Sequence, residues 1–209
     1  MASGRNDMRG HWDSRYADSE LVWSTEPNVF VRREVEGMIP GRALDLGTGE
    51  GRNAIWLAEQ GWDVTGVDFS EAGLAKAERL AGSRDVRVTW VLADLLEFEP
   101  EPGAFDLVLL VYLHLPAEWR RTVLVRAAAA LAPGGTLLIV GHDRSNLEEG
   151  VGGPRDPAVL YTAEELIGDL PPGLEVERAE RVTRTVEAEG HGGPGVALDA
   201  LVRARRPAG

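Results

Sequence analysis

The sequence predicts an α/β protein: a three-layer sandwich in which helices cover a mostly parallel sheet of seven strands. Segments typical of strands alternate with segments typical of helices along most of the chain. Residues 105–111 are almost wholly apolar, as expected of a central parallel strand that is covered on both faces. The last two strand-like segments, 174–185 and 196–204, are separated only by a glycine-rich stretch. These observations together predict a parallel sheet whose last strand is antiparallel.

The length, net charge and composition of the chain favour a small-molecule partner. A chain of 209 residues is expected to form one domain with a sizeable core. Its formal net charge of −12 argues against a broad phosphate-binding surface, so we expect no nucleic-acid partner. The absence of cysteine excludes disulfides and thiolate nucleophiles, and it suits a cytoplasmic location. We expect no membrane partner, because no stretch resembles a signal peptide or a membrane span.

The first 40 residues are expected to form a helical arm in front of the core, which spans residues 41–209. The expected parts of the arm are a mobile stretch, a short helix and a second helix, at residues 1–10, 11–16 and 29–38. Its aromatic residues Trp12, Tyr16 and Trp23 allow two interpretations. They either pack the arm on the core or form a lid over a bound ligand.

The core begins with a strand at residues 42–46, a glycine turn and a helix at residues 50–60. Glycines at the alternate positions 47, 49 and 51 allow a sharp bend and a close approach of backbone to a ligand. The helix that follows offers unpaired N–H groups in its first turn. In an open α/β sheet such a turn lies at the carboxyl edge, where ligands bind.

A second acidic strand end supports a ligand site at this turn. Residues 63–67 read as the next strand, and Asp68 follows directly. A carboxylate at this position can accept hydrogen bonds from both hydroxyls of a ribose. The alternative is that Asp68 is only an acid in the N-cap region of the next helix. With the glycine turn in front of it, the ribose role is favoured.

Asp45, just before the glycine turn, helps to choose between two nucleoside ligands. The dinucleotide fingerprint is G-x-G-x-x-G, whereas this chain has G-x-G-x-G. A carboxylate at Asp45 would repel a pyrophosphate but could hold an ammonium group, or it could simply brace the turn by hydrogen bonds. A ligand with a ribose and an amino-acid moiety therefore fits better than a dinucleotide.

The later elements follow the same alternation of strands and helices. A capping box of Thr162 and Glu165 predicts the start of a helix after a long loop at residues 146–157. The other expected elements are a helix at 71–81, a strand at 87–91, a helix at 117–131, a turn at 132–135 and a strand at 136–140.

The stretches 45–51 and 67–70 resemble, as a pair, the first two motifs of class I S-adenosylmethionine (SAM)-dependent methyltransferases. The run from Leu131 to Leu137 resembles the turn that precedes their fifth strand, and the N-terminal segment resembles small-molecule members of the thiopurine and tellurite-resistance types. The resemblance implies a Rossmann-like sheet of order 3-2-1-4-5-7-6 and SAM as cofactor, with S-adenosylhomocysteine (SAH) as product.

The resemblance also implies which residues bind the cofactor. Asp94, after the third strand, matches the position that accepts a hydrogen bond from the adenine amino group, although a loop acid or cap is the alternative. The full expected set is Tyr16, Trp23, Asp45, Gly47, Thr48, Gly49, Arg52, Asn53, Asp68, Phe69, Ser70, Ala93, Asp94, Leu95 and Val111.

Candidates for contact with the methyl acceptor follow the fourth and fifth strands; they are Tyr112, His114, His142, Asp143 and Arg144. His114 is the candidate for a catalytic base, and packing at a loop is its alternative. A base is optional in methyl transfer, because the sulfonium is already an activated leaving group. No spacing of histidines and acids indicates a metal site.

The sequence therefore predicts a SAM-dependent methyltransferase that acts on a small molecule as a monomer or homodimer. Two alternatives remain. A non-catalytic SAM-binding or scaffold protein would carry the same cofactor residues. A nicotinamide-dependent oxidoreductase is disfavoured by Asp45 and by the absence of the G-x-G-x-x-G pattern.

Overall fold

The structure is a computed structural model that describes residues 2–17, 21–22, 24–186 and 195–208. Its elements, in chain order, are α1 (Ala2–Ala17), α2 (Val29–Val35), β1 (Arg42–Leu46), α3 (Arg52–Glu59), β2 (Asp63–Asp68), α4 (Glu71–Ser83), β3 (Thr89–Leu92), β4 (Phe105–Val111), α5 (Ala117–Ala130), β5 (Leu131–His142), α6 (Asn146–Glu149), η1 (Pro157–Val159), α7 (Ala163–Asp169), β6 (Glu175–Val186) and β7 (Gly195–Arg205).

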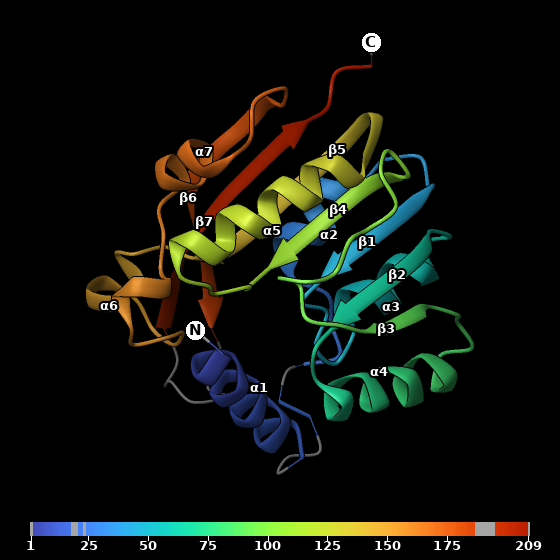
Figure 1. Ribbon diagram of the computed structural model, residues 1–209, viewed down its shortest axis with the longest axis horizontal. Coiled ribbons are helices and arrows are strands. Elements are labelled where there is room, and N and C mark those ends of the chain that lie inside the picture. The colour runs from blue at the N-terminus through green and yellow to red at the C-terminus, as the bar shows by residue number, and fades with distance from the viewer. Residues whose placement is uncertain (1, 18–20, 23, 187–194, 209) are drawn as a thin grey trace. The chain divides into compact units, whose positions relative to one another are not determined.

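The seven strands pair in the order β3-β2-β1-β4-β5-β7-β6 (Figure 1). The pairs β1–β2, β2–β3 and β4–β5 are parallel, whereas β7 is antiparallel to both β5 and β6. This confirms the predicted fold class and strand order. The chain divides into two compact units, residues 1–99 and 100–209, which are described in turn. The expectation of a single domain stays a prediction.

The first unit is a short parallel ladder with its carboxyl ends in register. Asp45 pairs with Gly66, and Asp68 pairs with Leu92. Gly66 is needed in this ladder because a Cβ there would lie 2.7 Å from the ring of Trp90. The indole thus lies close to both Gly66 on β2 and Gly51 of the glycine turn.

The N-terminal stretch differs from the prediction. Residues 1–10 were expected to be mobile, yet helix α1 begins at Ala2 and runs to Ala17. Its C-terminal part lies beside α4 (Figure 1), where the Ser70 hydroxyl donates a hydrogen bond of 2.5 Å to Asp13 Oδ1. The polar composition of residues 1–10 gives no helical pattern, which is why the sequence did not predict this part of the helix.

The second unit contains β4, β5, β7 and β6, with α5 and α7 packed against them. Residues 107–111 are all buried, as the apolar run predicted. The predicted turn at 132–135 was wrong as a separate element, because β5 runs from Leu131 to His142. Its pairing with β4 shifts register between Phe105 and Leu107, and Gly134 has a φ of +79°. The glycines therefore make an irregularity within a strand.

Short helical segments interrupt the loop expected at residues 146–157, namely α6 and η1. The capping box at the start of α7 is confirmed, since Thr162 Oγ1 accepts from the Glu165 amide and Glu165 Oε2 accepts from the Thr162 amide. In the part of the chain that the structure describes, no helix is long and apolar enough to cross a membrane.

Candidate active site

The glycine turn after β1 has the backbone conformation that the sequence predicted. Gly47, Gly49 and Gly51 have φ values of +78°, +56° and +80°, a region that disfavours residues with a Cβ. The amides of Gly47 and Thr48 donate to the Val67 carbonyl at 2.9 and 3.0 Å, which ties the turn to β2. Gly51 is the N-cap of α3 and supplies no side-chain cap. The Ala54 amide in the first turn of α3 bonds to the Asp45 carboxylate, so that side chain takes the place of a cap.

Asp45 lies under this turn and is 1% exposed. Its Oδ2 accepts a hydrogen bond of 2.7 Å from Thr48 Oγ1, so the bracing role considered in the sequence is present. Burial raises the pKa of Asp45 to about 6, and the nearby Asp68 acts in the same direction, while the Thr48 hydrogen bond opposes the shift. At neutral pH the site thus contains a buried carboxylate that a cation would stabilise.

Asp68 connects the glycine turn to the start of α4. Its Oδ2 accepts from the Gly49 amide at 2.8 Å, and its Oδ1 accepts from the Ser70 amide at 2.9 Å. Burial raises its pKa, and these backbone hydrogen bonds oppose the rise. A carboxylate has about four acceptor positions, and the backbone amides, that of Phe69 among them, occupy only part of these. This geometry fits the two hydroxyls of a ribose.

Helix α1 covers this part of the first unit with Tyr16, which is 5% exposed. A Cβ on Gly49 would lie 2.6 Å from the Tyr16 hydroxyl, and a Cβ on Gly73 would lie 3.2 Å from its ring. The Trp12 ring lies 5.5 Å from the Tyr16 ring, between centroids. Tyr16 thus packs the arm on the core, and a lid role for Tyr16 and Trp12 stays a prediction. The predicted contact of Trp23 falls on a residue outside the described part of the chain.

The segment before α2 is fastened to the same turn. The Asn28 amide donates to Asn53 Oδ1 at 2.9 Å, and the Val22 amide donates to both carboxylate oxygens of Glu50 at 3.0 Å. Glu50 is also paired with Lys76 at 3.0 Å. The side-chain oxygen of Asn53 thus already has a protein partner, and whether Asn53 and Arg52 contact a cofactor stays a prediction.

The remaining predicted cofactor residues surround the ends of β2 and β3, apart from Val111, which ends β4 in the second unit. Ser70 caps α4 through a bond from the Gly73 amide at 3.1 Å, and the Ala93 amide donates to the Asp68 carbonyl at 2.9 Å. Asp94 Oδ1 accepts from the Leu96 amide at 2.9 Å, so its alternative role as a turn cap is present. The contacts of Phe69 and Leu95 with a cofactor also stay predictions.

In the second unit, Tyr112 is set apart by its backbone. It follows β4 directly and has a φ of +55°, one of two described residues other than glycine with a positive φ. Such strain is concentrated at functional sites. The Tyr112 hydroxyl donates to Asp199 Oδ2 at 2.8 Å, and Arg184 Nε donates to the same carboxylate oxygen at 2.9 Å and to the Tyr112 hydroxyl at 2.7 Å.

The sequence reasoning missed Asp199 and Arg184. Asp199 is completely buried on β7, in a run that is otherwise apolar from Val196 to Val202. An acid within such a run was the available signal, because a charge is almost never fully buried unless it is paired. Its partner on β6, Arg184, could not be found from spacing alone, since it depends on the antiparallel register.

The two histidines lie against one another beside Tyr112. The His114 and His142 rings are stacked with centroids 5.4 Å apart, and His142 lies 5.0 Å from the Tyr112 ring. His114 Nδ1 is 3.3 Å from the Val159 carbonyl, and its Nε2 accepts from the His142 amide at 3.5 Å. Burial lowers the pKa of His114 to about 4, and His142 adds to the effect. His114 is thus neutral at physiological pH; its role as a base stays a prediction.

Two further candidates anchor the loop that follows β5. Asp143 Oδ1 accepts from the amide and the hydroxyl of Ser145, at 2.9 and 2.7 Å. Arg144 donates to the carbonyls of Pro157 and Leu160 and to Glu165. Both side chains therefore organise the loop, and their contact with an acceptor remains a prediction.

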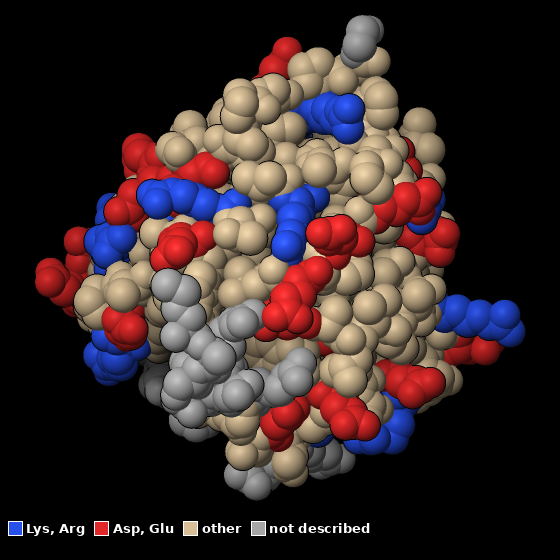
Figure 2. Space-filling model, viewed as in Figure 1, with Lys and Arg blue, Asp and Glu red and all other residues tan. Residues whose placement is uncertain are grey.

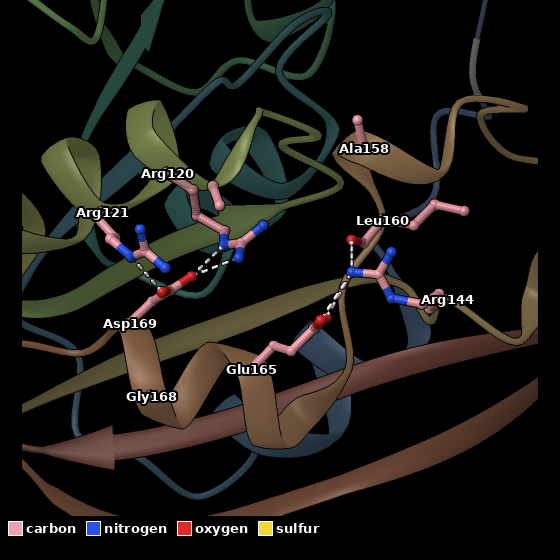
Figure 3. A pocket seen from close by; sticks show the side chains of 9 residues that line it. Arg120, Arg121, Arg144, Ala158, Leu160, Glu165, Gly168 and Asp169 are labelled. Atoms are coloured by element: carbon pink, nitrogen blue, oxygen red, sulfur yellow. Dashed lines mark hydrogen bonds and ion pairs between the residues drawn. The ribbon is translucent and has the colours of Figure 1, made fainter.

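A cavity of about 310 Å³ lies between α5, α7 and this loop (Figure 3). Arg120 and Arg121 both donate to Asp169, and Arg144 pairs with Glu165 on the opposite wall. Figure 2 shows acidic and basic side chains interspersed on the visible face, without one continuous basic patch.

Among the described residues there is no group of three or more His, Cys, Asp or Glu that could hold a metal ion.

Comparison with known proteins places these features in a family. Residues 43–135 match a family described as a methyltransferase domain. A 2-heptyl-1-hydroxyquinolin-4(1H)-one methyltransferase from Mycobacteroides abscessus is 28% identical over 137 residues, or 63% of this chain and 60% of that protein. A demethylmenaquinone methyltransferase from Thermus thermophilus is 37% identical over 103 residues, or 48% of this chain and 47% of that protein. The matches thus span about half to three fifths of these relatives.

The fold is shared by a solved structure. Its description refers to the conversion of a disulfide bond into a thioacetal group during echinomycin biosynthesis. It matches with a TM-score of 0.77 at 24% identity, covering 96% of this chain and 94% of that chain. The matched domain agrees with the position of the glycine turn and of Asp68, and the strand order agrees with the structural match. Residues 43–135 thus resemble a methyltransferase domain, and the chain has the strand order of the class I SAM-dependent methyltransferase fold.

Proposed function

We propose that this protein transfers the methyl group of SAM to a small-molecule acceptor, leaving SAH. The observation that carries the proposal is the Asp68 carboxylate, which two backbone amides hold next to the glycine turn with acceptor positions left over. The buried Asp45 carboxylate, beside the glycine turn, suits the ammonium group at the amino-acid end of the cofactor. The residues of the first unit thus fit SAM.

SAM supplies a methyl group on a positively charged sulfur, which is an activated leaving group. The contribution left to the protein is to bind, to align and to exclude water. Alignment alone can lower a barrier by roughly 7–11 kcal/mol in favourable cases. Tyr16 and Trp12 on α1 would exclude water over the cofactor, because Tyr16 is already packed on Gly49 and Gly73.

For the acceptor we propose a small molecule that is bound by residues of the second unit. The aromatic group of Tyr112, His142 and His114 supports this, since it combines stacked rings with the buried Asp199. The names of the two relatives, which refer to a hydroxyquinolone and to demethylmenaquinone, support a ring-bearing small molecule. The acidic net charge of −12 argues against nucleic acid. A cytoplasmic location and a monomeric or homodimeric state complete the proposal.

The alternatives are less well supported. A nicotinamide-dependent oxidoreductase would place a pyrophosphate at the glycine turn, next to the buried carboxylate of Asp45. A SAM-binding scaffold would need no buried histidine and carboxylate pair in the second unit, yet His142 and Asp199 form one.

The test is SAM binding by the Asp68→Ala variant, measured by titration calorimetry. We expect SAM affinity to fall by roughly tenfold or more, because hydrogen bonds to a charged group contribute about 1.5–3 kcal/mol. Asp63→Ala is the matched control, since Asp63 is exposed at the other end of the same strand. Circular dichroism checks that both variants fold. Equal affinity of folded Asp68→Ala and wild-type protein would contradict the ribose assignment.

A further inference from the structure

Two buried polar atoms in the second unit have no hydrogen-bond partner within the described part of the chain: His142 Nδ1 and Asp199 Oδ1. They face one another at 3.2 Å, with side-chain exposures of 9% and 0%. Native proteins rarely leave such atoms unsatisfied, and each exception calls for an explanation. Hydrogen bonds of catalytic groups are often poorly aligned until the reacting complex forms. This pair therefore points to a catalytic arrangement.

The sheet fixes this pair rigidly. His142 is the last residue of β5, and it pairs directly with Asp199 in the antiparallel register with β7. The other carboxylate oxygen, Oδ2, accepts from Tyr112 and from Arg184. The hydrogen bonds that Tyr112 and Arg184 donate to Oδ2 leave Oδ1 directed toward the imidazole. This is the arrangement of a base and a carboxylate that orients it.

We propose that His142 is the general base for a hydroxyl-bearing acceptor and that Asp199 is its positioning residue. The inference rests on the proposed methyl transfer and names the chemistry of its acceptor. An oxygen lone pair of the hydroxyl forms the new O–CH₃ bond while the C–S bond breaks, and the bond electrons remain on sulfur. The hydroxyl proton passes to His142 Nε2. The resulting imidazolium is stabilised by Asp199 through Nδ1–H.

His142 suits this role better than His114, although both lie in one stack. His114 Nδ1 faces the Val159 carbonyl, which cannot balance the charge of an imidazolium as a carboxylate can. The charged or titratable groups around His142 are Asp199 on β7, Tyr112 and His114 after β4, and, through Asp199, Arg184 on β6. Asp199 is the only carboxylate among these named groups.

Gly153 leaves the Nε2 edge of His142 without a covering side chain. A Cβ at this position would lie 2.6 Å from His142 Cδ2 and 2.9 Å from Nε2. The Cβ of any other residue would therefore lie within hydrogen-bonding distance of Nε2, the nitrogen that receives the proton. Gly153 therefore allows its backbone to pack closely on this edge of the imidazole.

The tautomer of His142 tests the arrangement without any acceptor. In protein labelled with ¹⁵N-histidine, NMR should show Nδ1 protonated and Nε2 carrying the lone pair at neutral to alkaline pH. In Asp199→Asn the amide can donate to Nδ1, so we expect the proton to move to Nε2. A wild-type His142 with its proton on Nε2 would overturn the proposal, since Nε2 could not then accept one.

A pair of probe acceptors tests the proton transfer itself. We would compare a phenol, whose pKa is about 10, with a nitrophenol that is already ionised near pH 8. His142→Gln and Asp199→Asn should lower turnover of the phenol by roughly 10²–10⁴-fold and change turnover of the ionised nitrophenol far less. His114→Gln is the matched comparison, and its effect should be the same on both acceptors.

The outcomes separate this inference from the proposed function. Equal losses on the two acceptors in His142→Gln would make His142 structural and overturn the base. Methylation of neither phenol by protein that binds SAM would contradict the hydroxyl class of acceptor. Failure to bind SAM, in contrast, would contradict the proposed function itself.

Discussion

At the scale of single residues, the site is built from carboxylates that the fold buries. The sequence located Asp45 and Asp68, because both end strands beside a glycine turn of recognisable spacing. It could not locate Asp199, because its partners, on β5, on β6 and directly after β4, are brought to it by long-range pairing. Local spacing encodes the cofactor turn, whereas the cluster around His142 depends on the register of distant strands.

Asp45 predicts a specific dependence of stability on pH. Its pKa is raised from 3.8 to about 6 on folding, so the folded state binds more protons between these values. The free energy of unfolding should therefore fall as pH rises through this window, by about 3 kcal/mol at most. Asp45→Asn removes the ionisation and should gain stability relative to wild type between pH 4 and pH 7. Thermal unfolding at the two pH values measures this. A difference in stability between Asp45→Asn and wild type that is the same at pH 4 and pH 7 would contradict this prediction.

At the scale of elements, the loop after β5 is where sequence and structure agree least. The sequence predicted an open stretch with glycine and proline, but the loop carries α6 and η1 and is anchored by Arg144. Glycine content predicts a loop correctly but does not show which glycine contacts a site. Gly152 and Gly153 are adjacent, yet only a Cβ at Gly153 would meet another residue.

This difference predicts that two neighbouring substitutions lower the free energy of unfolding by unequal amounts. Gly152→Ala and Gly153→Ala both place a Cβ at a positive φ, +73° and +81°, which costs about 1–2 kcal/mol. Only Gly153→Ala also collides with His142, so it should lose roughly 1–3 kcal/mol more. Chemical denaturation of the two variants measures the difference. Equal stabilities would show that the loop does not hold Gly153 against the imidazole.

The contact between α5 and α7 depends on a buried ion pair. Arg120 is 6% exposed and donates two hydrogen bonds to Asp169, which is 8% exposed and also binds Arg121. Asp169→Asn removes the counter-charge of a buried guanidinium and should cost about 3–5 kcal/mol of unfolding free energy.

The control for this prediction is an exposed pair on β6. Glu180→Gln breaks the pair with Arg178 near the surface and should change stability by less than about 1 kcal/mol. Denaturant unfolding compares the two variants. A change in Asp169→Asn as small as that of the control would mean that α7 does not depend on this ion pair.

At the scale of the whole molecule, the alternation of elements predicted the fold class, and the resemblance to the family motifs predicted the strand order that the structure has. Helix α1 did not, since its residues 2–10 are too polar to show a helical pattern. The proposed function divides between expected cofactor residues of the first unit and expected acceptor residues of the second. The cofactor is the claim on which the acceptor chemistry depends.

The most direct measurement is titration calorimetry of the wild-type protein with SAM, SAH and NAD in parallel. The glycine turn, Asp45 and Asp68 predict micromolar binding of SAM and SAH and no heat of binding with NAD. Binding of NAD without SAM or SAH, or no binding of SAM and SAH by the folded protein, would contradict the assignment of this site.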